Sequence, residues 1–250
     1  MENVKSRIEF HRDDHKISGH LWGRKEEPQH AVILCHGFLA NEKMCHKYAA
    51  LLEQQGFMAV TFDFCGGGIG VKSEGRSQDM TVFTEMADLM AVVKGVRSRY
   101  APLSISLLGC SQGGLVSAMV AREPGNEIYK LILLYPALCI PDDARKGKMM
   151  FYKFDPENIP EVLGRFPMKL GGEYARSVKE LDPLEMIRGY DGPVLYLQGS
   201  EDNVVDVSYA RRAKEVYHNC QYHEIAGGGH MFRGEHDLEA CRLISAFMSE

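Results

Sequence analysis

The chain has 250 residues, of which 45% are hydrophobic and 25% are charged, and its formal net charge is −5. This composition is typical of a globular protein and excludes a disordered or fibrous chain. At this length folding buries roughly 70–75% of the extended chain's surface, so a core forms without disulfide or metal staples. The mild acidity argues against binding to a phosphate backbone, and we expect no nucleic-acid partner.

Targeting signals and cysteine usage indicate the compartment. The N-terminal residues contain no apolar segment typical of a secretory signal, and no stretch reaches the ~18–20 consecutive apolar residues of a transmembrane helix. The seven cysteines are odd in number and scattered without a CxxC pair, a usage typical of reduced thiols. We therefore expect a cytoplasmic protein with no membrane partner.

Hydrophobic periodicity predicts strands that alternate with helices. An opening hairpin is expected over residues 7–11 and 16–22. Further buried strands are expected at 31–35, 58–62, 103–109, 130–135, 194–198 and 221–225. Helices are expected at 41–55, 82–96, 113–123, 208–217 and 237–248. This alternation predicts an α/β fold with a mostly parallel central sheet and helices on both faces.

One segment, from about residue 136 to residue 188, interrupts the alternation. It holds six prolines and several aromatic side chains but no clear strand. More than 50 residues are too many for a bare loop, so we interpret the segment as a lid or cap inserted within a single domain that spans residues 1–250. A disordered excursion is the alternative, and the aromatic content argues against it.

The strongest chemical signal is the pattern Gly109-x-Ser111-x-Gly113, which falls between a predicted strand and a predicted helix. A serine on such a tight strand-to-helix turn projects above the sheet edge, and the flanking glycines let the backbones pass. The helix that follows directs its free N–H groups toward developing negative charge. The pattern predicts that Ser111 is a nucleophile; a purely structural turn serine is the alternative.

A serine nucleophile needs a base, and ten histidines are available. His230 is the best candidate, because it follows the last predicted strand and a run of three glycines that can bring an imidazole over the sheet edge. Its competitors are His223, expected within the strand, and His236, expected beyond the loop. The early histidines are expected at the surface: His11, His15, His20 and His30.

The base needs a carboxylate that fixes its tautomer. Asp202, just after the strand at 194–198, is the first choice; Glu201 and Asp206 flank it, and Asp206 can equally cap a helix. A tetrahedral intermediate also needs oxyanion donors. We expect these to be the backbone N–H groups of Gln112 and of Phe38, which follows a glycine after an early strand.

These residues resemble those of the α/β-hydrolases, in which the order Ser, Asp, His is the rule. More narrowly, the chain resembles the bacterial feruloyl (cinnamoyl) esterases over nearly its whole length, segment 136–188 included. The motifs that carry the resemblance are His36-Gly37-Phe38, Gly109-x-Ser111-Gln112-Gly113-Gly114, Phe154–Pro160 and Gly171-Gly172-x-Tyr174. The resemblance implies an α/β-hydrolase fold with an inserted lid, which presents Asp143 and Tyr174 to a phenolic ring.

The sequence departs from that family at two places. The residue before the nucleophile is Cys110, where relatives often have histidine, and this leaves the three catalytic candidates intact. The loop Gly66–Ser73 is longer than the usual turn. It is expected to border the site, so it bears on substrate preference.

The sequence thus predicts a serine carboxylic-ester hydrolase that works through an acyl-enzyme on a small-molecule ester, with no cofactor and no metal. The glycine loop fits no nucleotide motif, and the late histidines lack a tight ligand pair. Two alternatives remain, a serine peptidase for acyl-peptides or dipeptides and a catalytically silent ligand-binding module. A second copy of the chain, forming a homodimer, is the one protein partner that the sequence leaves open.

Overall fold

A single eight-stranded sheet runs through the molecule in the order β1-β2-β4-β3-β5-β6-β11-β12. The computed structural model describes residues 5–23, 28–102 and 104–250. The strands of this sheet are β1 (Lys5–Arg12), β2 (His15–Trp22), β3 (His30–Cys35), β4 (Met58–Phe62), β5 (Ser104–Cys110), β6 (Ile128–Leu134), β11 (Val194–Gly199) and β12 (Cys220–Ile225). All neighbours from β4 to β12 pair in parallel, and only the β1–β2 and β2–β4 pairs are antiparallel. The predicted α/β fold is confirmed.

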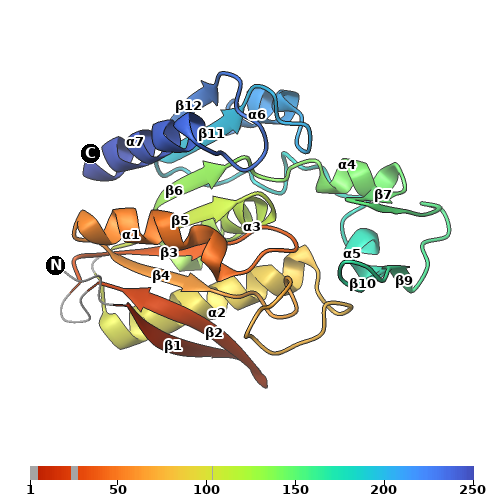
Figure 1. Ribbon diagram of the computed structural model, residues 1–250, viewed down its shortest axis with the longest axis horizontal. Coiled ribbons are helices and arrows are strands. Elements are labelled where there is room, and N and C mark those ends of the chain that lie inside the picture. Colours follow the sequence, from red (N-terminus) through yellow and green to blue (C-terminus); the bar gives the residue numbers. More distant parts are fainter. Residues whose placement is uncertain (1–4, 24–27, 103) are drawn as a thin grey trace.

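Helices cover both faces of the sheet, as Figure 1 shows. The helices α1 (His46–Gln54) and α7 (Glu235–Ser249) pack on one face; α2 (Val82–Tyr100), α3 (Gln112–Ala121) and α6 (Val207–Ala213) pack on the other. Two short 3-10 helices complete the main body: η1 (Glu42–Cys45) directly precedes α1, and η2 (Pro124–Asn126) follows α3. The central strands β3 and β4 are almost wholly buried because apolar side chains cover them from both sides.

Some predicted boundaries shift. The helix predicted over 41–55 is divided, because the Asn41 side chain accepts a hydrogen bond from the Lys43 N–H and caps the 3-10 turn of η1. The helix predicted over 208–217 ends at Ala213. Leu103, the predicted first residue of a strand, lies outside the described residues, as do residues 1–4 of the N-terminal stretch considered above.

The expectation of surface histidines holds for His11, which is exposed, and in part for the other three, whose side chains are partly exposed. His20 is half-buried against the Glu42 carboxylate, and its Nδ1 lies 2.5 Å from Oε1. His30 is half-buried, with its Nε2 2.8 Å from the Ser106 hydroxyl. His15 is partly buried as well. Contacts with residues distant in the sequence, Glu42 for His20 and Ser106 for His30, partly cover these two rings.

Segment 136–188 projects from the C-terminal edge of the sheet, on the right of Figure 1. It is built from short elements: α4 (Ile140–Arg145), β7 (Lys148–Met149), β8 (Tyr152–Lys153), β9 (Val162–Gly164), β10 (Leu170–Gly171) and α5 (Glu173–Arg176). Pairing is confined to two small antiparallel ribbons, β7–β8 and β9–β10. Tyr152, Leu170 and Tyr174 are buried in the core cluster that α2 and α3 also share, so this segment packs on the main body.

In the part of the chain that the structure describes, no helix combines the length and apolar character needed to cross a bilayer. The seven cysteines are all free thiols. Cys110 is completely buried, in keeping with a packing role beside Ser111.

Candidate active site

Ser111 occupies the turn between β5 and α3, where its backbone adopts φ 53° and ψ −119°. A non-glycine residue in this region is strained, and such strain is found where function requires it. Glycines make the turn feasible. A Cβ on Gly113 would lie 2.3 Å from the His36 carbonyl oxygen, and one on Gly109 would lie 2.3 Å from the Gly113 carbonyl oxygen. The glycine spacing therefore has the steric origin that the sequence predicts.

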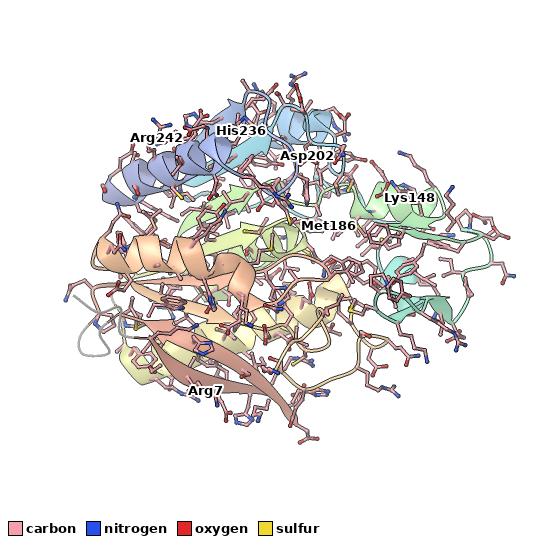
Figure 2. All side chains as sticks on the ribbon, viewed as in Figure 1. Arg7, Lys148, Met186, Asp202, His236 and Arg242 are labelled. Carbon is pink, nitrogen blue, oxygen red and sulfur yellow. The ribbon has the colours of Figure 1, made fainter. Side chains whose placement is uncertain are left out.

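The structure brings Ser111, His230 and Asp202 together. His230 Nε2 lies 3.0 Å from Ser111 Oγ, and His230 Nδ1 lies 2.8 Å from Asp202 Oδ2. Ser111 follows β5, His230 follows β12 and Asp202 follows β11, all at the C-terminal edge of the sheet. Asp202 is labelled in Figure 2. This is the geometry of a nucleophile, a base and a group that orients the base.

The competing residues are placed elsewhere. Asp206 accepts a hydrogen bond from the Ser208 N–H and caps α6, and Glu201 is exposed. His223 lies within β12 and His236 in α7.

Three donors besides His230 hold the Asp202 carboxylate. The backbone N–H groups of Val204 and Val205 donate to Oδ1 at 2.8 and 2.9 Å, and the Gln198 side-chain amide donates to Oδ2 at 2.8 Å. Burial alone would raise the pKa of Asp202, but the hydrogen bonds from His230 and from the Val204 and Val205 N–H groups outweigh burial and lower this pKa. Sequence reasoning missed Gln198, although a polar residue at the end of an apolar strand was an available signal.

The two predicted oxyanion donors are free for a ligand. Among the described residues, neither the Phe38 N–H nor the Gln112 N–H donates a hydrogen bond to a protein acceptor. Gly37 brings the Phe38 turn against Ser111, since a Cβ on Gly37 would lie 3.1 Å from Ser111 Cβ.

The long loop Gly66–Ser73 is hydrogen-bonded to the residue that follows Phe38. Leu39 pairs with Gly68 in an isolated bridge, and the Ile69 N–H donates to the Leu39 carbonyl at 3.2 Å. The loop therefore borders the Phe38 turn, as the sequence suggested. Within the described residues it contributes no side chain to the cavity beside Ser111.

A buried hydrogen-bond network lies behind the Gln112 backbone. The Gln112 side-chain amide donates to Glu85 Oε2 at 2.7 Å, and its carbonyl oxygen accepts a hydrogen bond from the Tyr174 hydroxyl. Glu85 and Tyr174 are each 1% exposed. Burial raises the pKa of Glu85 well above its usual value, although the hydrogen bond from Gln112 acts in the opposite direction. Glu85 was not predicted, although an acidic residue on the buried face of an amphipathic helix was a signal.

A cavity of about 150 Å³ opens beside Ser111, between the sheet edge and segment 136–188. Its walls are mainly apolar, and Asp143, Lys148 and Asn203 add polar side chains to those of Ser111 and Gln112. The other lining residues are Phe38, Ala137, Cys139, Ile140, Met149, Met150, Phe151, Tyr174 and Val204. Burial raises the pKa of Asp143, although the charges of Lys148 and Lys146 act in the opposite direction.

Tyr174 contributes its ring to this cavity while its hydroxyl is committed to Gln112. Asp143 and Tyr174, predicted from different parts of the segment, thus line one cavity with Ser111. An apolar pocket with a few polar groups suits a small organic ligand.

Comparison with known proteins places the chain in a family. Residues 26–165 match the family model Hydrolase_4, described as serine aminopeptidase, S33. The chain belongs to this family. The matched range includes the Phe38 turn and Ser111, and Asp202 and His230 follow it. Fold and family together make the protein a hydrolase of the α/β-hydrolase superfamily.

Solved structures agree with the feruloyl esterase resemblance. Est1E from Butyrivibrio proteoclasticus, in complex with ferulic acid, is 29% identical with a TM-score of 0.87, covering 96% of this chain and 97% of that chain. DcsB in complex with a substrate analogue is 21% identical with a TM-score of 0.79, covering 98% of this chain and 99% of that chain, and this likeness shows the fold alone.

The curated relatives match a smaller part of the chain. Monoglyceride lipase of Rattus norvegicus is 28% identical over 169 residues, which are 64% of this chain and 52% of that protein. The chain thus spans about half the length of the curated relatives it matches.

Proposed function

We propose that the protein is a serine esterase that cleaves small carboxylic esters, with hydroxycinnamates of the feruloyl type as its acyl groups, through an acyl-enzyme. One observation carries the proposal: the hydrogen-bonded chain from Asp202 through His230 to Ser111 ends at a mainly apolar cavity.

In the proposed mechanism, His230 Nε2 takes the Ser111 proton as Oγ attacks the ester carbonyl carbon. The carbonyl oxygen gains negative charge and accepts hydrogen bonds from the Phe38 and Gln112 N–H groups. His230 then gives the proton to the departing alcohol, which leaves the acyl group on Ser111. A water molecule, deprotonated by His230, attacks the acyl-enzyme, and the acid departs as Oγ recovers the proton.

The cavity supports the choice of acyl group. Its apolar walls suit a flat aromatic ring, and Asp143 offers a carboxylate that can accept a hydrogen bond from a phenol. Segment 136–188 supplies most of these walls, so we assign it the role of a cap over the acyl group. The ferulic acid bound to Est1E is the matching ligand of a similar protein.

A peptidase is the second candidate, because the family model is described as a serine aminopeptidase. The same three side chains would serve both reactions, which differ in the leaving group. A binding module without catalysis is the third.

A substrate panel separates these candidates. Purified protein is assayed with methyl ferulate, methyl p-coumarate, p-nitrophenyl acetate, p-nitrophenyl octanoate and an acyl-peptide anilide. We expect the highest kcat/KM for the hydroxycinnamates. Preference for the octanoate or the anilide would move the function to a lipase or a peptidase, and a folded protein inactive on every substrate would favour the binding module.

The nucleophile is tested in the same assay. Ser111→Ala is expected to abolish the burst of alcohol release and the acyl adduct detected by intact-protein mass spectrometry. A matched control is Ser208→Ala on the surface of α6. Turnover retained by Ser111→Ala, with unchanged circular dichroism, would exclude Ser111 as the nucleophile.

A further inference from the structure

A second group of chemically capable side chains lies on the face of the sheet that α1 covers. His20 comes from β2, Glu42 opens η1, and His46 opens α1. One ligating atom from each residue lies within 4.8 Å of the other two. Within the described residues, none of the three lines the cavity beside Ser111, and the proposed mechanism uses none of them.

The arrangement leaves one buried donor or acceptor unsatisfied. His46 Nε2 is buried without a hydrogen-bond partner in the described structure, although it lies 3.5 Å from Glu42 Oε2. An imidazole nitrogen that carries no proton offers a lone pair to a metal ion. A buried polar atom without a partner is uncommon and calls for a physical explanation.

The carboxylate between the two rings is held by outer partners. Thr61 Oγ1 donates to Glu42 Oε2 at 2.6 Å, and Trp22 Nε1 donates to Thr61 Oγ1 at 3.2 Å. The Glu42 N–H in turn donates to Asp63 Oδ1 at 2.8 Å. Ligating carboxylates are typically oriented by such second contacts. Glu42 itself is 7% exposed, whereas both histidine rings reach solvent at one edge.

We propose that His20, Glu42 and His46 form a binding site for a divalent transition-metal ion, with Zn²⁺ the best match. Two imidazoles and one carboxylate are a donor set that suits zinc, and a water molecule would complete four ligands from the solvent side. The site would join β2 to η1, which begins four residues after Phe38.

Binding requires two local changes. His20 Nδ1 and Glu42 Oε1, now 2.5 Å apart, must separate to about 3.3 Å, the ligand spacing of a tetrahedral zinc site. Lys5 must also leave, because its Nζ lies 3.5 Å from His46 Nδ1. In this position the ammonium charge of Lys5 repels a cation. Its N–H also points at His46 Nδ1, which favours the His46 tautomer with the proton on Nε2, where no lone pair is left for a metal ion. The exposed Lys5 side chain is therefore an antagonist of the site.

The test is titration of chelator-treated protein with ZnCl₂ by isothermal calorimetry. We expect one Zn²⁺ per chain, and either His20→Ala or His46→Ala should weaken the affinity by more than the roughly 10–100-fold that loss of an outer contact to a ligand costs. Lys5→Ala should tighten binding several-fold. His11→Ala, which removes an exposed histidine from the same hairpin, is the matched control and should bind as the wild type does.

Two results would overturn the site: no stoichiometric binding to the wild type, or binding that neither His20→Ala nor His46→Ala weakens. The latter would place the metal elsewhere, for example on His230. If the alanine variants fail to fold, Co²⁺ bound to the wild-type protein gives a direct answer. Intense visible bands indicate tetrahedral ligands, and only the weak bands of hydrated Co²⁺ refute the site. Because no ester is hydrolysed in these measurements, failure here leaves the proposed esterase untouched.

Discussion

At the residue scale, the Asp202 carboxylate is held by more hydrogen bonds than His230 alone supplies. Asp202→Asn removes the charge that stabilises an imidazolium and permits the wrong histidine tautomer. We expect kcat to fall by roughly three to four orders of magnitude while the fold is kept. Steady-state kinetics with an activated ester measures the effect, with Glu201→Gln as the exposed control. A rate within tenfold of wild type would contradict the role of Asp202.

Tyr174 and Asp143 line the same cavity but are predicted to act differently. Tyr174→Phe leaves the Gln112 carbonyl oxygen unpaired in a buried position, so unfolding free energy should fall by about 1–3 kcal/mol. Because the lost hydroxyl contacts Gln112, rates for ferulate and acetate esters should fall alike. Urea unfolding and the two kcat/KM values measure these effects.

Asp143 faces the cavity, so Asp143→Asn is expected to lower kcat/KM for ferulate esters and leave acetate esters nearly unchanged. The ratio of the two substrates in the same assay measures this selectivity. A selective ferulate loss in Tyr174→Phe, together with no selectivity in Asp143→Asn, would reverse the two assignments.

The sequence predicts which residues meet at the site better than it predicts the residues that hydrogen-bond to them and hold them in place. Ser111, His230 and Asp202 follow strands and stand out by residue type. Gln198 and Glu85 act through side-chain hydrogen bonds, Gln198 to Asp202 four positions away and Glu85 to Gln112 27 positions away. A polar residue in an apolar pattern signals such a support but does not name its partner.

At the scale of elements, the β5–α3 turn depends on the absence of a side chain at Gly113. Gly113→Ala places a Cβ 2.3 Å from the His36 carbonyl oxygen, and this backbone atom cannot move away without displacing the Phe38 turn. We expect destabilisation of about 2–4 kcal/mol and loss of most ester hydrolysis.

Gly125→Ala is the matched control for this prediction, because within the described residues no atom beyond the chain neighbours of Gly125 lies within 4 Å of the added Cβ. Urea unfolding followed by circular dichroism compares the two variants. Equal stability of Gly113→Ala and Gly125→Ala would mean that the turn tolerates a side chain.

Element positions were largely predictable because their apolar periods are local. The strand at Met58–Phe62 agrees with its prediction at both ends. Helix boundaries that depend on capping residues were harder to predict from the sequence. The division of the helix at Cys45 follows from an Asn41 side chain that caps a 3-10 turn, and α2 continues to Tyr100 because Ala101 takes the left-handed cap position. The short ribbons of segment 136–188 carry too few residues to show any period.

At the scale of the whole molecule, His30 links stability to pH. Burial, reinforced by the charge of Lys130, lowers the pKa of His30 from 6.5 to about 4. The unfolded chain therefore takes up a proton at a higher pH than the folded chain does. Stability from this residue is complete above pH 6.5 and is lost as the pH falls toward 4.

His30→Gln should remove this dependence. Relative to the variant, the wild type should lose about 1 kcal/mol of unfolding free energy between pH 6.5 and 4, a value reduced because the ring is half exposed. Urea midpoints across this range measure the difference, and His11→Gln is the exposed control. A wild-type loss no larger than that of His30→Gln would exclude His30 as the source.

The parallel sheet with its site at the C-terminal edge was predictable, since strand–helix alternation admits few topologies. Strand order and the packing of segment 136–188 were not, because they depend on contacts between residues far apart in the sequence.

Both ends of that segment are anchored to neighbouring strands. β6 and β11 pair in parallel from Leu131–Val194 to Leu134–Leu197, the Leu131 N–H donates to the Pro193 carbonyl, and the Tyr135 N–H donates to the Leu197 carbonyl. The chain thus leaves the sheet from one strand and returns to it in the neighbouring strand, and hydrogen bonds fix the two strands side by side. Substitutions, insertions or exchange of the whole segment between these strands can change which ligands the pocket accepts. The positions of Ser111, Asp202 and His230 stay the same, because they depend on the sheet and not on the segment. Substrate range in such a protein can evolve separately from catalysis.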